Sequence, residues 1–82
     1  MSPQSSIDLT FIIAVFRQAL ELEDDLDLNS ESAFEDVPGW DSLGHMRIIS
    51  EIEDQLDIEF EIEEIVDQNT VGKIHNLVLS KL

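Results

Sequence analysis

The sequence predicts an all-α fold: a four-helix bundle with three longer helices, one short helix and a long first loop. Apolar residues recur with helical spacing in three separate segments, and the one strand-like segment has no second strand to pair with. The chain has 82 residues, of which 43% are apolar, which suits one small hydrophobic core. We therefore expect a single domain over residues 1–82.

The first helix is expected from Ile7 to about Leu22. Its apolar positions fall on one helical stripe, formed by Leu9, Ile12, Ile13, Phe16 and Leu20. Ser5 or Ser6 is the expected N-cap, and Asp8 suits the first turn because its negative charge complements the helix dipole.

A long polar connection follows, from about Glu23 to Trp40. Connections of this length are unusual in so small a domain and tend to be functional. Four apolar residues are expected to anchor it to the core: Leu26, Leu28, Phe34 and Val37.

The second helix is expected to begin at Asp41 or Ser42 and to end near Leu56. Asp41 follows a Pro-Gly turn and is a good N-cap candidate. The predicted buried stripe is Ile48, Ile49, Ile52 and Leu56, with Leu43 and Met46 at its rim.

Two further helices are expected after an extended linker. Ile58, Phe60 and Ile62 alternate with acids like a strand, but they lack a partner strand. A short helix from about Ile62 to Asp67 follows. The last helix begins behind the cap Thr70, and its predicted buried face is Val71, Ile74, Leu77, Val78 and Leu82.

Charge restricts the classes of partner. Nineteen acidic residues face four Lys and Arg, which gives a formal net charge of −15. Such a chain repels nucleic acid and anionic membranes and attracts proteins with basic patches. There is no cysteine, so any reactive thiol must come from a cofactor. Neither a membrane span nor a secretory signal is recognisable, and we expect a cytoplasmic location.

Ser42 is the residue best placed to carry a group. It stands in an Asp-Ser-Leu segment at a helix start, directly after a tight turn. Free backbone N–H groups and the helix dipole favour an anionic phosphate at that point. An ordinary first-turn serine is the alternative that the tripeptide alone leaves open.

Four segments place this tripeptide in a wider pattern: Ser32-Ala33-Phe34-Glu35-Asp36, Trp40-Asp41-Ser42-Leu43-Gly44-His45-Met46, Glu51-Ile52-Glu53-Asp54-Gln55-Leu56-Asp57-Ile58 and Thr70-Val71-Gly72-Lys73-Ile74. With these segments in order, the chain resembles the acyl carrier proteins over nearly its whole length, and in particular the stand-alone bacterial type. The family's modified serine falls on Ser42, and the Asp that takes part in cofactor attachment falls on Asp41.

The resemblance implies a monomeric carrier with no catalytic residue of its own. A phosphopantetheinyl transferase would use Mg²⁺ to move 4'-phosphopantetheine from coenzyme A to Ser42. The arm's thiol would then hold acyl groups as thioesters for fatty-acid, polyketide or other specialised enzymes. The family's docking surface on the second helix would comprise Leu43, Met46, Arg47, Ser50, Glu51 and Asp54.

Four positions depart from the common fatty-acid carrier. Gly44 and Arg47 stand where acids are frequent, Ser50 where an apolar residue is common, and Trp40 where a small residue is common. These departures favour a specialised pathway. Trp40 is expected either to contact substrate or to cover the end of the bundle.

A calcium-binding loop is one alternative to the carrier. Asp25, Asp27, Asn29, Glu31 and Asp36 follow EF-hand spacing, but Ser30 replaces the required Gly and Asp36 the required Glu, so we expect a solvated loop and no metal site.

A serine hydrolase is excluded because Trp40 stands where the nucleophile elbow needs Gly, and His45 is poorly aimed at Ser42. We expect His45 to be an exposed helix residue and His75 to be exposed or partly buried. An acidic interaction domain without a prosthetic group, or a weak calcium binder, is the remaining alternative.

Overall fold

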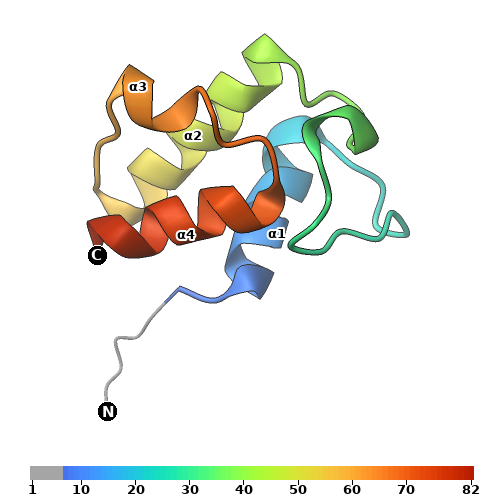
Figure 1. The fold of residues 1–82 in the computed structure, drawn as a ribbon. Coiled ribbons are helices and arrows are strands. Elements are labelled where there is room, and N and C mark those ends of the chain that lie inside the picture. The colour runs from blue at the N-terminus through green and yellow to red at the C-terminus, as the bar shows by residue number, and fades with distance from the viewer. Residues whose placement is uncertain (1–6) are drawn as a thin grey trace.

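The structure, a computed structural model, describes residues 7–82 and confirms the all-α fold. Its elements are α1 (Leu9–Leu20), the 3-10 helix η1 (Phe34–Asp36), α2 (Ser42–Leu56), α3 (Ile62–Ile65) and α4 (Val71–Lys81). Figure 1 shows α2 and α4 on opposite sides of the bundle, α1 crossing behind them, and the long connection at one end. Between residues 7 and 82 there is no strand, only one isolated antiparallel bridge from Ala33 to Thr70.

The first helix is shorter than predicted at both ends. Asp8 is its N-cap, because the Asp8 Oδ1 atom accepts a hydrogen bond from the Phe11 N–H at 3.1 Å. The predicted start at Ile7 is therefore wrong, and the predicted caps Ser5 and Ser6 lie outside the described residues. The helix ends at Leu20 because Glu21 adopts a left-handed backbone conformation with φ 55°, which stops helical propagation.

The starts of α2 and α4 are confirmed. Asp41 caps α2 through a 2.8 Å hydrogen bond from the Gly44 N–H, and Thr70 caps α4 through a 3.1 Å bond from the Lys73 N–H. Helix α3 ends at Ile65 rather than at Asp67. The turn that follows α3 is tighter than an α-helix, since the N–H of Gln68 bonds to the Ile65 carbonyl, three residues back.

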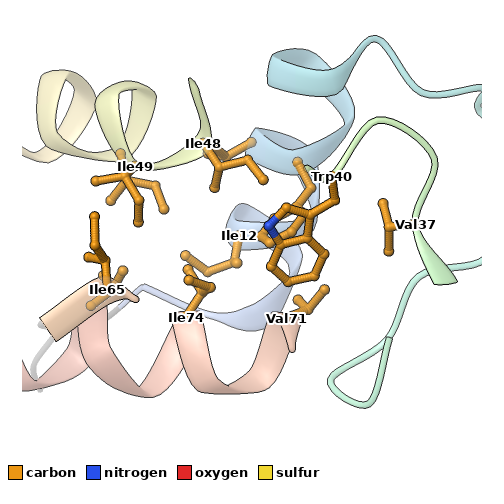
Figure 2. Packing of buried hydrophobic residues seen from close by; sticks show 12 residues of the cluster. Ile12, Val37, Trp40, Ile48, Ile49, Ile65, Val71 and Ile74 are labelled. Atoms are coloured by element: carbon orange, nitrogen blue, oxygen red, sulfur yellow. The ribbon is translucent and has the colours of Figure 1, made fainter. Parts of the chain in front are cut away.

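One hydrophobic core joins all four helices and the long connection. Figure 2 shows side chains from these elements turned toward one another, with the Trp40 indole among them. The buried apolar residues are Ile12, Val15, Phe16, Val37, Trp40, Ile48, Ile49, Ile52, Ile65, Val71, Ile74 and Val78. Val15 was not on the predicted stripe of the first helix. Leu82 was predicted to be buried but is 60% exposed, because α4 ends at Lys81, before this residue.

The long connection is anchored less evenly than predicted. Val37 is buried and Leu28 packs against the core, whereas Leu26 is half-buried outside this cluster and Phe34 is exposed. Backbone hydrogen bonds tie the connection to the start of α4, from Val71 N–H to the Ser32 carbonyl and from Gly72 N–H to the Ser30 carbonyl. The connection is therefore held against the end of the bundle at which α2 and α4 begin.

None of the described helices is long and apolar enough to cross a membrane.

Candidate functional site

Ser42 is the first residue of α2 and is exposed. The N–H of Gly44 is satisfied by the Asp41 carboxylate, and the N–H of His45 by the Asp41 carbonyl at 2.7 Å. Helix geometry leaves the N–H groups of Ser42 and Leu43 without an intrahelical acceptor. A phosphate on the Ser42 hydroxyl would lie beside these two donors and the positive end of the helix dipole.

A tight turn presents this serine to solvent. Gly39 has φ 82°, a left-handed conformation that glycine adopts without strain. The Trp40 N–H bonds to the Val37 carbonyl at 3.1 Å and the Asp41 N–H to the Gly39 carbonyl at 3.0 Å. The chain therefore reverses within a few residues and enters α2 with Ser42 on the outside.

Gly44 allows this turn to lie against the helix. An ideal Cβ atom on Gly44 would overlap the Gly39 carbonyl oxygen and lie 2.9 Å from Cδ2 of Leu20. The departure from the family's frequent acid at this position therefore has a packing reason. No longer side chain fits between α2, the turn and the end of α1 in this arrangement.

Trp40 takes one of the two positions expected of it, whereas His45 does not lie where it was expected. Trp40 is 3% exposed and packs edge-to-face on Phe16, with ring centroids 4.7 Å apart, so it covers the bundle end from within the core. His45 is half-buried, and the prediction of an exposed residue is wrong. Its Nδ1 atom accepts a 2.9 Å hydrogen bond from Nε1–H of Trp40, and its Nε2 atom lies 2.8 Å from the Ile65 carbonyl oxygen.

A groove of about 370 Å³ opens beside Ser42. Seven large apolar side chains are exposed within residues 7–82, and four of them line this groove, so it is the main apolar surface described. Its walls come from the 3-10 helix, α2, α3 and the turn after α3, and they are Phe34, Ser42, His45, Met46, Ile62, Ile65, Val66 and Gln68. The groove was not predicted from the sequence, although the apolar residues Ile62 and Val66 in an acidic segment were a possible signal.

The six residues predicted to bind partners come together on the outer side of α2. All of them line one shallow groove that also includes Gln18 and Ala19 of α1; they are Leu43, Met46, Arg47, Ser50, Glu51 and Asp54. Leu43 is 65% exposed, and Met46 lines both this groove and the one beside Ser42. Their role in partner binding remains a prediction.

The clustered acids of the long connection do not assemble around a common point. Within residues 7–82, no group of three or more His, Asp or Glu side chains is placed to hold a metal ion. Asn29, one of the EF-hand positions, instead uses its side-chain oxygen to accept the Glu31 N–H at 2.8 Å. His75, on α4, is half-buried with its Nε2 atom 2.9 Å from the Ile7 carbonyl oxygen.

Comparison with protein families accounts for this arrangement. Residues 10–78 match the family model described as the phosphopantetheine attachment site. The chain belongs to this family. It is a carrier protein rather than a catalyst, and its cofactor is a covalently attached phosphopantetheine. Members of the family act with biosynthetic enzymes and phosphopantetheinyl transferases.

A solved structure supports the same conclusion. The carrier is similar to the holo acyl carrier protein of Geobacter metallireducens, determined by solution NMR, with a TM-score of 0.79 and 33% sequence identity. The similarity covers 89% of this chain and 83% of the other. No curated protein sequence matches this carrier. The exposed serine at a helix start, its free N–H groups and the adjacent apolar groove fit a phosphopantetheine arm.

Proposed function

We propose that this chain is a single-domain, monomeric acyl carrier protein whose phosphopantetheine is attached to Ser42. The observation that carries the proposal is the exposed hydroxyl of Ser42 at the first position of α2, inside the segment that matches the family. Asp41 supports it in two ways. Its carboxylate fixes the start of the helix through Gly44, and it stays exposed next to the hydroxyl.

Attachment would be carried out by a phosphopantetheinyl transferase with Mg²⁺. The Ser42 oxygen would form a bond to the β-phosphorus of coenzyme A and lose its proton. The phosphoanhydride bond would break, and adenosine 3',5'-bisphosphate would leave. The phosphodiester so formed would accept hydrogen bonds from the N–H groups of Ser42 and Leu43.

The groove beside Ser42 is the proposed resting place of the arm and of a short acyl group. The twelve residues of the core are at most 4% exposed, and Trp40 fills the bundle end next to the attachment site. The groove walls are mainly apolar, and their polar residues are Ser42 itself, His45 and Gln68. Apolar cargo would gain from burial there without unpacking the core.

The outer side of α2 is the proposed surface for partner enzymes with basic patches. It presents the apolar side chains of Leu43 and Met46, the acids Glu51 and Asp54, and a single basic residue, Arg47. That combination differs from a uniformly acidic surface and favours partners from a specialised pathway, such as polyketide assembly or a dedicated acyl transfer, over those of general fatty-acid synthesis.

The attachment site is tested by mass spectrometry. The intact protein is incubated with coenzyme A, Mg²⁺ and a broad-specificity transferase. One arm is expected on the wild-type protein and on Ser80→Ala, which removes an exposed serine of α4 away from the proposed partner surface, and none on Ser42→Ala. An arm on Ser42→Ala, or no arm on the wild-type protein, would contradict the proposal.

A further inference from the structure

The ring of His45 makes two hydrogen bonds beside Ser42, one from Trp40 and one to the Ile65 carbonyl. The residue lies three positions after Ser42 on α2 and lines the groove itself. One ring nitrogen contacts the Trp40 indole and the other contacts the Ile65 carbonyl of α3, twenty residues further along the chain. These contacts join the start of α2 to Trp40, at the end of the long connection, and to Ile65, the last residue of α3.

The partners of the ring determine its protonation. The indole Nε1–H of Trp40 can only donate, so Nδ1 of His45 must be the unprotonated acceptor. The carbonyl of Ile65 can only accept, so Nε2 must carry the hydrogen. Both hydrogen bonds therefore exist together only in the neutral imidazole with hydrogen on Nε2.

Each hydrogen bond supports one wall of the groove. Ile65 belongs to α3, a single turn; the groove residues Ile62, at its start, and Val66, directly after it, are both exposed. Ile65 is the buried residue of α3, so α3 packs on the core through one apolar side chain. The hydrogen bond between its carbonyl and His45 adds a polar contact to that packing. On the other side, the Trp40 and His45 rings lie nearly parallel, with an interplanar angle of 14°, and the Trp40 ring centroid lies 5.6 Å from that of Phe34, which lines another wall of the groove.

We infer that His45 is the positioning residue of the groove: its ring ties α3 and Trp40 to α2 and so fixes the surface against which the arm and cargo lie. The inference rests on the proposed function for the identity of the occupant. The two hydrogen bonds themselves are testable without any cofactor.

Two substitutions separate the two hydrogen bonds. The His45→Asn side chain places an amide oxygen near the Nδ1 position, so it keeps an acceptor for Trp40 and loses the donor to Ile65. The His45→Gln side chain places an amide nitrogen near the Nε2 position, so it keeps the donor to Ile65 and loses the acceptor for Trp40. His75→Asn is the matched control, since His75 also contacts a backbone carbonyl but lies on α4.

The first experiment uses the unmodified protein. Ring ¹⁵N spectra are expected to show the Nε2–H form of His45. Amide exchange in residues 62–68 should be about 3- to 10-fold faster in His45→Asn than in wild type, His45→Gln or His75→Asn, as expected for one lost hydrogen bond. The Trp40 indole resonance should shift in His45→Gln and stay in place in His45→Asn. An Nδ1–H form, or equal exchange in His45→Asn and His45→Gln, would overturn the inference.

The second experiment uses the same variants bearing the arm with a butyryl group. Acylation should change the amide shifts of Ile62 and Val66 in wild type and His45→Gln, and these changes should fall by half or more in His45→Asn. Equal changes in all variants would show that the ring stabilises α3 without positioning the groove. Failure to attach any arm would contradict the proposed function, while the measurements on the unmodified protein would still decide the role of His45.

Discussion

Gly44 of α2 packs directly against the carbonyl oxygen of Gly39, and even a methyl group at Gly44 would overlap that oxygen. The contact joins the turn before α2 to the helix that the turn introduces. Because Cδ2 of Leu20 closes the same space from α1, the first turn of α2 is fixed from two sides.

Substitution of Gly44 by Ala should therefore destabilise the protein. In an unobstructed helix this change gains up to about 1 kcal/mol. Here we expect a net loss of about 1–3 kcal/mol, because overpacking forces the turn or Leu20 to move. Urea unfolding followed by circular dichroism measures the change. Ser50→Ala, at an exposed α2 position, serves as the control and should be nearly neutral. A Gly44→Ala protein that is at least as stable as wild type would contradict the packing argument.

Glu64 should contribute stability that depends on pH. Its Oε1 atom accepts hydrogen bonds from Lys81 Nζ and from the Glu61 N–H, both at 2.8 Å. The Lys81 hydrogen bond, the Glu61 hydrogen bond and the positive charge of Lys81 hold the pKa of Glu64 below its ordinary value of 4.5. Since the folded pKa is the lower one, the contribution is fully present above pH 4.5 and is lost as the pH falls through the folded pKa.

Thermal melts of Glu64→Gln and wild type test this pH dependence. At neutral pH the variant should melt at a slightly lower temperature, and in strong acid the difference should vanish. Glu63→Gln, which removes a neighbouring exposed carboxylate of α3, should melt at least as high as wild type at neutral pH because it lowers the excess negative charge. A difference between Glu64→Gln and wild type that is independent of pH would assign the effect to packing.

Added salt should raise the melting temperature at neutral pH. The net charge of −15 makes the folded chain repel itself, and counterions screen that repulsion. MgCl₂ should act more strongly than NaCl at equal ionic strength, since divalent cations accumulate more at a dense negative surface. Calorimetric melts over a salt series measure the effect. A midpoint that stays constant or falls would show that the acids are already balanced within the fold.

Arg47 should help to select the partner enzyme. Within residues 7–82 it is the basic side chain without a hydrogen-bond or ion-pair partner, whereas Arg17, Lys73 and Lys81 each have one. An exposed Arg would repel a basic residue of a generic fatty-acid enzyme and attract an acid on the true partner. One exposed charge contributes about 1 kcal/mol or less, so we expect a several-fold effect.

The comparison uses wild-type and Arg47→Glu carriers, both bearing the arm. Arg47→Glu should be a better substrate for a fatty-acid condensing enzyme and a poorer one for an enzyme encoded near the carrier's gene. Lys73→Glu makes the same change of net charge on α4 and should affect the two enzymes alike. If Arg47→Glu also affects both enzymes alike, Arg47 does not discriminate between them.

The starts of α2 and α4 were predictable from the sequence because they depend on neighbours in the chain. Asp41 and Thr70 cap these helices by accepting a hydrogen bond from the N–H three residues later. Contacts of this kind depend only on residues within one turn, so a short stretch of sequence is enough to predict them. The position of Ser42 at the start of a helix follows from the same local chemistry. The start of α1 was misplaced because several residues competed as caps, and Asp8 is the cap of the folded helix.

The all-α class, the stripe of Ile48, Ile49 and Ile52, and the exposed serine could be predicted from the sequence, since each follows from periodicity or from contacts within one turn. The burial of Trp40, the contact of His45 with both Trp40 and Ile65, and the groove beside Ser42 became visible only in the packed structure. These features arise where segments that are distant in the sequence meet, as His45 and Ile65 do across twenty residues. Their geometry depends on how the helices pack, which local spacing does not encode.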